Sequence, residues 1–274
     1  MKRLVPSEDW PKSWNESYFY DLQEVYGEIS HRGYAYAYDN RRRKTLQLVS
    51  EVLSPPARIL DVAAAQGNFS LALAEMGYDV TWNDLRAELA DYVRQKHDRG
   101  VIDFAAGNAF ELNFPAPFDA LLITEIIEHV AHPDEFLAKA AGLVRPGGYI
   151  IMTTPNGKYF RNPLPKFSTC ADPSIYEAIQ FKPNSDGHIF LLHPEEVPTL
   201  ASAAGLEIDR CELFTNPLTN GHMKLEGLLR MVSPGFVQTI ERLTQHLPRF
   251  VGQRILIQMG VRFRKPVLPD SSPA

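Results

Sequence analysis

Residues 58–84 read RILDVAAAQGNFSLALAEMGYDVTWND, and their pattern of apolar and small residues indicates the class of fold. The apolar run over 58–62 predicts a short buried strand that leads directly into a turn of small residues, AAAQG, at 63–67. The spacing of the apolar residues then predicts a helix over 70–77, and a second apolar run predicts a strand over 78–84. The stretch is therefore a strand–helix–strand unit, in which the two strands are parallel neighbours.

The same alternation extends to both sides of this unit. An aromatic-rich segment over 1–33 predicts short helices, and an amphipathic helix is predicted over 40–53, where two prolines end it. Further helices are predicted over 85–97, 125–130, 133–144, 194–205 and within 222–247, and further strands over 101–108, 118–124, 149–154, 205–214 and 254–263. We therefore expect an α/β fold with a doubly wound, mostly parallel, seven-stranded sheet, helices on both faces, and a ligand crevice at the carboxyl ends of the strands.

Length and composition limit the class of protein. The chain has 274 residues, a net charge of −5 and 45% apolar side chains, which is typical of a domain that buries its own core without disulfides. The cysteines, Cys170 and Cys211, are too few and too far apart for a disulfide framework or a zinc ribbon. No apolar run approaches 18 residues, and no signal-peptide pattern follows the N-terminus. We expect a cytoplasmic protein without a membrane span.

The turn at 63–67 is the strongest chemical signal. A turn of small residues before a helix lets a ligand approach backbone N–H groups at the helix N-terminus. The turn lacks the G-x-G-x-x-G pattern, which argues against a nicotinamide dinucleotide. Asp61 ends the first strand and Asp84 ends the next, and a carboxylate in the second position can accept both hydroxyls of a ribose.

A second stretch, AAGNAFELNFPAPFDALLITEIIEHVAHPDEFLAKAAGLVRPGGYIIMTTPNG at 105–157, completes a recognisable pattern. Over residues 40–214 the chain resembles the class I S-adenosylmethionine-dependent methyltransferases, and among them the ubiquinone-biosynthesis O-methyltransferase branch. The resemblance implies a methyltransferase enzyme with a Rossmann-like fold and S-adenosylmethionine as cofactor. It implies cofactor-binding roles for Arg43, Asp61, Ala63, Ala65, Gly67, Asp84, Leu85, Asn108, Ala109 and Thr124.

Three of these positions carry alternatives. Arg43 is also one of the charges in the run Arg41 to Lys44, which a solvent-exposed helix face would explain equally well. The family has glycines where this chain has Ala63 and Ala65, and alanine costs on the order of 1 kcal/mol wherever a positive φ is required. Asn108 replaces an aspartate, keeping an acceptor for the adenine amino group while losing a charge.

The composition and the alternation of strands and helices also indicate a division of the chain. We expect an aromatic-rich N-terminal cap over 1–39, the methyltransferase domain over 40–265, and a disordered tail over 266–274. Within the domain, residues 157–190 form a lid insertion and residues 215–252 a helical insertion.

Glu125, Glu128 and His129 are spaced at i, i+3 and i+4, which places them on one face of a predicted helix at the crevice. Two carboxylates and an imidazole suit Mg²⁺ or another divalent cation, although the same spacing also occurs in helices whose glutamates form surface ion pairs. The resemblance favours the metal. Likeness to small-RNA 3′-terminal 2′-O-methyltransferases adds His188 as a candidate fourth ligand; the alternatives are His193 as the ligand, or His188 as a lid histidine bonded to the backbone. Without a metal, His129 or His188 becomes the catalytic base.

These features favour O-methylation of a small hydroxylated metabolite, with or without a divalent metal. RNA 3′-terminal 2′-O-methylation is the second hypothesis. The acidic net charge argues against a nucleic-acid partner, although Arg262, Arg264 and Lys265 could form a basic patch with the run at 41–44. A third hypothesis is a non-catalytic S-adenosylmethionine-binding domain that lost activity through Ala63 and Ala65.

Overall fold

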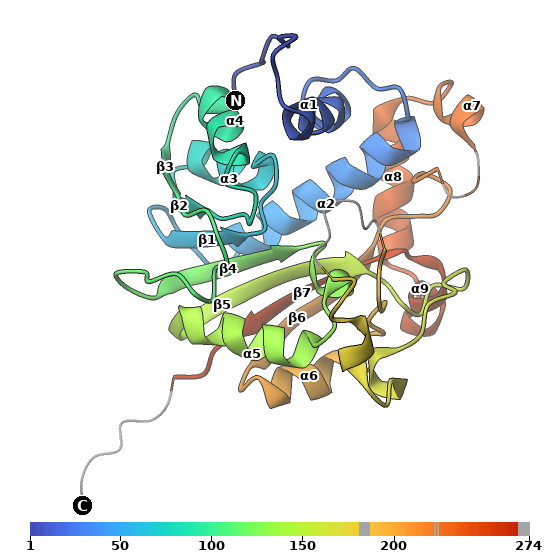
Figure 1. Cartoon of the computed structure of the whole chain (residues 1–274). Helices are drawn as coiled ribbons and strands as arrows, with labels where there is room; N and C mark the ends of the chain where they lie inside the picture. The colour runs from blue at the N-terminus through green and yellow to red at the C-terminus, as the bar shows by residue number, and fades with distance from the viewer. Residues whose placement is uncertain (181–186, 222, 224, 268–274) are drawn as a thin grey trace, which may run out of the picture.

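The computed structural model describes residues 1–180, 187–221, 223 and 225–267, so part of the predicted lid and most of the predicted tail lie outside the described residues. A seven-stranded sheet forms the centre, in the order β3-β2-β1-β4-β5-β7-β6 (Figure 1). All neighbours are parallel except β7, which is antiparallel to β5 and β6. The strands are β1 Arg58–Val62, β2 Asp79–Trp82, β3 Val101–Phe104, β4 Phe118–Thr124, β5 Val144–Pro155, β6 Glu207–Phe214 and β7 Gln258–Arg264. The predicted α/β architecture is confirmed.

Helices cover both faces of the sheet. Figure 1 shows α2, α3 and α4 on one face of the sheet and α5 and α6 on the other. Helices α7 to α9 lie at the right of the view, where α7 contacts α2 and α8 contacts β6. The helices are α1 Lys12–Glu24, α2 Arg32–Ser50, α3 Asn68–Glu75, α4 Leu89–Lys96, α5 Pro133–Leu143, α6 Val197–Ala203, α7 Glu226–Leu229, α8 Pro234–Gln245 and α9 Arg249–Ile255, with 3₁₀ turns η1 Ile127–His129, η2 Phe167–Thr169 and η3 Pro173–Tyr176. In the described part of the chain, no helix is long and apolar enough to cross a membrane.

The central strands are buried on both faces because each face carries a helix layer. Along β4, Leu121 and Ile123 pack into the cluster beneath α5, whereas Ala120 and Leu122 pack into the cluster beneath α2 and α3. Alternate side chains of a strand point to opposite faces, so an uninterrupted apolar run is what this position requires.

Several predicted elements have other bounds in the structure, and two of these differences concern helices that border the sheet. The helix predicted over 40–53 begins eight residues earlier, at Arg32, because Ala35 and Tyr38 continue its buried face. The expected boundary between residues 39 and 40 therefore falls inside α2. The strand predicted over 254–263 begins only at Gln258, since Arg249–Ile255 form α9.

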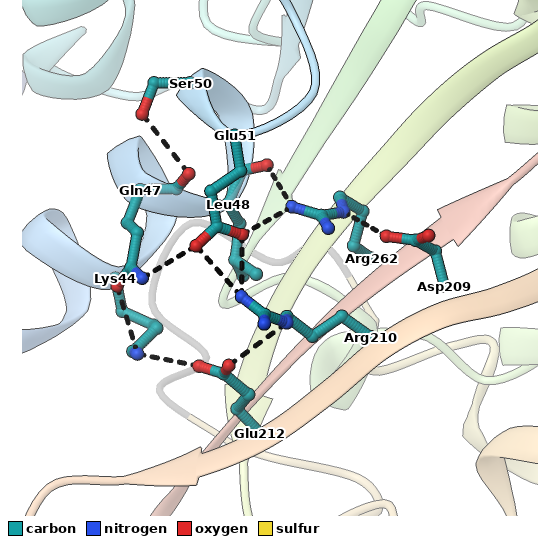
Figure 2. A network of polar contacts seen from close by, with 9 residues as sticks. All are labelled: Lys44, Gln47, Leu48, Ser50, Glu51, Asp209, Arg210, Glu212 and Arg262. Atoms are coloured by element: carbon teal, nitrogen blue, oxygen red, sulfur yellow. Dashed lines mark hydrogen bonds and ion pairs between the residues drawn. The ribbon is translucent and has the colours of Figure 1, made fainter.

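A network of ion pairs fastens the end of α2 to β6 and β7 (Figure 2). At its centre, Nη1 of Arg262 donates to the carbonyl oxygen of Leu48 at 2.8 Å and contacts Glu51 at 2.9 Å, while Nε contacts Asp209 at 2.5 Å. The Leu48 carbonyl lies in the last turn of α2. Carbonyl groups at a helix C-terminus lack N–H partners from a following helical turn, and the negative end of the helix dipole attracts cations. The other members of the network are Lys44, Gln47, Ser50, Arg210 and Glu212.

Candidate active site

The turn between β1 and α3 has a left-handed backbone, the conformation that is costly for the alanines of this sequence. Ala63 has φ 50°, Ala65 has φ 47° and Gly67 has φ 70°, so all three are left-handed. Two alanines in this region cost on the order of 1 kcal/mol each. Side chains hold the turn there: the N–H of Ala65 donates to Asp84 at 2.9 Å, and Nε1 of Trp82 donates to the carbonyl of Ala65 at 3.0 Å.

The two predicted aspartates face different partners. Asp61 is buried and accepts a hydrogen bond from Oγ of Ser70 at 2.6 Å, so it ties β1 to α3, and burial raises its pKa to about 7. Asp84 is also buried, directly after β2, where its carboxylate accepts the Ala65 N–H at 2.9 Å and pairs with Nε of Arg86 at 3.0 Å. The sequence analysis did not single out Arg86, whose guanidinium bends back onto the carboxylate of Asp84 two residues earlier.

The first cavity lies beyond the ends of β1, β2 and β4 and has a volume of about 350 Å³. Four of the predicted cofactor residues line it, namely Ala63, Leu85, Asn108 and Ala109. Asn108 caps its own loop, since its Oδ1 accepts the N–H of Phe110 at 3.1 Å. The apolar side chains of Phe110, Ile126 and Phe136 form another part of the wall.

A second cavity, of about 110 Å³ and called the narrow cavity below, shares Ala63 with the first one and is also lined by the turn, Thr124, Glu125 and Arg41. Nη1 of Arg41 lies 3.1 Å from Glu125. Arg43 is absent from this lining and pairs with Asp39 at 2.7 Å, with about half of its side chain exposed. The structure therefore directs Arg41, not Arg43, into the crevice, because residues two apart on a helix point to nearly opposite sides.

The predicted helix at 125–130 is wrong. Glu125 has φ 55°, which stops regular structure directly after β4, and only the single 3₁₀ turn Ile127–His129 follows. The expected helical face that would have gathered Glu125 with Glu128 and His129 therefore does not exist. Non-glycine residues with positive φ are concentrated at functional sites, and Glu125 lies between two of the cavities.

Three of the four predicted metal-ligand residues still come together. One ligand atom from each of Glu128, His129 and His188 lies within 4.8 Å of the others, and Glu125 is outside this group in the described part of the chain. The two imidazole rings are edge to face, 4.9 Å apart. His129 Nδ1 is 3.3 Å from the carbonyl of Gly187. Because a carbonyl can only accept, Nδ1 carries the hydrogen in such a hydrogen bond, and the neutral ring then has a lone pair on Nε2 that can bind a metal.

Glu128 is fully buried. Its Oε2 accepts a hydrogen bond from Oγ1 of Thr154 at 3.0 Å, and its Oε1 has no partner among the described residues. Burial, reinforced by the nearby Glu125 carboxylate, raises the pKa of Glu128 well above its ordinary value. A buried carboxylate with one oxygen unsatisfied calls for a proton or a cation.

The wide cavity, about 920 Å³, opens on the other side of Glu125. His188 lines it, together with aromatic and apolar side chains that include Tyr34, Tyr159 and Leu164. Ala63 is shared by the first and narrow cavities, and Glu125 by the narrow and wide ones. The three cavities therefore form a row along the carboxyl ends of the strands, as a crevice in this kind of sheet predicts.

Comparison with known proteins agrees with this arrangement. A profile of the methyltransferase-domain family matches residues 31–210. The chain therefore belongs to the S-adenosylmethionine-dependent methyltransferase family. It is 34% identical over 170 residues to a ubiquinone biosynthesis O-methyltransferase of Rhizobium leguminosarum, covering 60% of this chain and 64% of that one.

Two further comparisons bear on the relationship. A ubiquinone biosynthesis O-methyltransferase of Xanthomonas campestris is 33% identical over 113 residues, covering 40% of this chain and 47% of that one. The structure of an S-adenosylmethionine-dependent methyltransferase from Mesorhizobium loti superposes with a TM-score of 0.54 at 15% identity, covering 81% of this chain and 96% of that one. The match to the curated relatives thus spans less than two thirds of their length, and the likeness to the solved structure concerns the fold.

Proposed function

We propose that the chain transfers a methyl group from S-adenosylmethionine to a hydroxyl of a small molecule. The observation that carries this proposal is the row of three cavities joined at Ala63 and Glu125. The first cavity is of a size for the adenine end, the narrow cavity for the methionine end, and the wide cavity for the acceptor. Its volume of about 920 Å³ lies in the range of small-molecule pockets.

The charges around the narrow cavity suit a zwitterionic amino-acid group. Arg41 projects into it, and two carboxylates, Glu24 and Glu125, also line its wall. A guanidinium can hold the cofactor's carboxylate through two parallel hydrogen bonds, and an acidic side chain can accept from its ammonium group. Asp84 and Asn108 then serve the ribose and the adenine, as the family resemblance implies.

Arg41→Ala is expected to weaken binding of S-adenosylhomocysteine by about 1.5–3 kcal/mol, because a charge-assisted hydrogen bond is lost. Arg43→Ala is the matched control from the same helix, and its affinity should stay within about twofold of the wild type, since Arg43 pairs outward with Asp39. Calorimetric titration of the three proteins measures this. Equal losses in both variants would remove Arg41 from the proposed carboxylate site.

We further propose that Glu128, His129 and His188 hold a divalent cation beside the acceptor. The donor set fits one, since a carboxylate oxygen of Glu128 and a nitrogen of each imidazole lie within 4.8 Å of one another, and Oε1 of Glu128 has no partner among the described residues. Such an ion would supply a Lewis acid for the acceptor oxygen. His188 lies on the wall of the wide cavity and orients the acceptor hydroxyl toward the row.

The proposed acceptor is a small molecule, because two cations of the basic patch considered for RNA are paired with carboxylates. Arg262 pairs with Glu51 and Asp209, and Lys44 pairs with Glu212 (Figure 2). Phosphate binding depends on cations that can release the counterions of the nucleic acid, and paired cations are poor at this.

A methyl-transfer assay tests the proposed function directly. The protein is incubated with S-adenosylmethionine, a divalent cation and a panel of phenols, catechols and other hydroxylated molecules, and methyl ethers are detected by mass spectrometry. We expect products from members of the panel and none from short RNA. Tight cofactor binding without turnover on any hydroxylated acceptor would instead favour the non-catalytic hypothesis.

A further inference from the structure

Lys96, at the end of α4, is fully buried beside the turn at 63–67. Its ammonium group lies 2.6 Å from Asp21 of α1, an ion pair in which both side chains are completely buried. It also donates to the backbone carbonyl of Gln66 at 2.9 Å and to Oδ1 of Asn68 at 2.6 Å. An ammonium group has three hydrogens, so these three acceptors use all of them.

The acceptors join three separate parts of the chain. Asp21 belongs to α1, Gln66 to the turn, and Asn68 begins α3. Nδ2 of Asn68 donates to Asp21 at 2.8 Å, and the hydroxyl of Tyr92 in α4 donates to the same carboxylate at 2.7 Å. The members of the network thus bond to one another, and together they connect α1 and α4 to the turn.

Glu24, one helical turn beyond Asp21, extends the network to the wall of the narrow cavity. Its Oε2 accepts from Nδ2 of Asn68 at 2.8 Å and from Nε2 of Gln66 at 3.0 Å. Glu24, Gln66 and Asn68 all line the narrow cavity, whereas Lys96 does not. Lys96 therefore acts on the cavity only through the residues it holds.

The turn needs to be held, because its left-handed alanines favour other conformations. Ala65 has φ 47° and directly precedes Gln66, whose carbonyl accepts the hydrogen bond from Lys96. A glycine at residue 65 would tolerate the same φ without an external restraint. In this chain the restraint comes from buried side chains instead.

We propose that Lys96 is a positioning residue for cofactor binding, which holds the strained turn at 63–67 in its binding conformation and docks α1 against it through Asp21. The N-terminal helix is accordingly part of the cofactor site. This inference rests on the proposed binding of S-adenosylmethionine in the row of cavities.

The test uses calorimetric affinity for S-adenosylhomocysteine in the full chain. Lys96→Met leaves Asp21 buried without its partner and can prevent folding, so the principal variant is Asp21→Asn/Lys96→Met, which removes both charges together. We expect this double variant to bind about tenfold more weakly than the wild type. Lys265→Met is the matched control, because Nζ of Lys265 also donates to two backbone carbonyls, at the end of α5 and far from the turn. Its affinity should stay within about twofold of the wild type.

Adding Ala65→Gly to the double variant separates positioning from general stability. If Lys96 holds a strained turn, glycine at 65 raises the affinity of the double variant by about threefold or more, and this gain exceeds the change that the same substitution causes in the wild type, where the turn is already held. Wild-type affinity in the double variant, or no recovery with Ala65→Gly, overturns the inference. Absence of binding in the wild type overturns the proposed cofactor function instead, so the two failures are distinguishable.

Discussion

Glu128→Gln is expected to lower the rate of methyl transfer by about 100-fold or more, equivalent to about 2.7 kcal/mol in the activation free energy. The variant should also bind Mn²⁺ or Mg²⁺ about 100-fold more weakly, because the negative ligand among Glu128, His129 and His188 is lost. Glutamine has nearly the same shape and can still accept the hydrogen bond from Thr154. The fold and the affinity for S-adenosylhomocysteine are therefore expected to stay near those of the wild type.

Glu125→Gln is the informative comparison for Glu128→Gln. Glu125 was expected from the sequence to be a ligand, but it lies outside the group of ligand atoms and pairs with Arg41 at 3.1 Å. Cation affinity, measured by calorimetry with each metal alone, should therefore change little in Glu125→Gln. Full turnover of the wild type in excess chelator, or unchanged cation affinity in Glu128→Gln, would contradict the metal site and leave the histidines as the candidate bases.

The sheet could be predicted from the sequence because its signals are local. Strands such as 58–62 and 118–124 are continuous apolar runs between helices with periodic apolar faces, and parallel packing leaves few alternatives for such a pattern. For the turn at 63–67, the sequence predicted an energetic cost if Ala63 or Ala65 had a positive φ. In the structure both alanines have a positive φ, so this cost is present.

The details of the site depend on contacts that no local pattern contains. The run Arg41 to Lys44 offers four cations, and only the packing of α2 decides that Arg41 faces the turn. The helical spacing of Glu125 and Glu128 was misleading, because Glu125 has a left-handed backbone and only a 3₁₀ turn follows it. Lys96 resembled any basic residue at the end of an amphipathic helix, yet it is fully buried.

Arg262→Ala is expected to lower the free energy of unfolding by about 3 kcal/mol. The guanidinium is 7% exposed and satisfies the Leu48 carbonyl at the end of α2, as well as Asp209 and Glu51 (Figure 2). Its removal leaves a helix-terminal carbonyl buried without a donor and takes away a favourable charge at the negative end of the helix. The expected loss is at the lower end of the range for buried ion pairs, because Glu51 keeps its contact with Arg210 at 2.8 Å.

Urea unfolding followed by circular dichroism measures the effect, and Arg145→Ala is the control for Arg262→Ala. Arg145 also pairs with a carboxylate at 2.5 Å, on Asp119, but its side chain is 48% exposed, so its loss should be below about 1 kcal/mol. If the two variants lose equal stability, the network at the end of α2 is no stronger than an ordinary surface ion pair. A selective loss in Arg262→Ala would show that α2, the helix that directs Arg41 into the crevice, is held at its far end by β7. The position of Arg41 would then depend on a strand more than 200 residues away in the sequence, which is why the spacing of charges in the run at 41–44 could not reveal it.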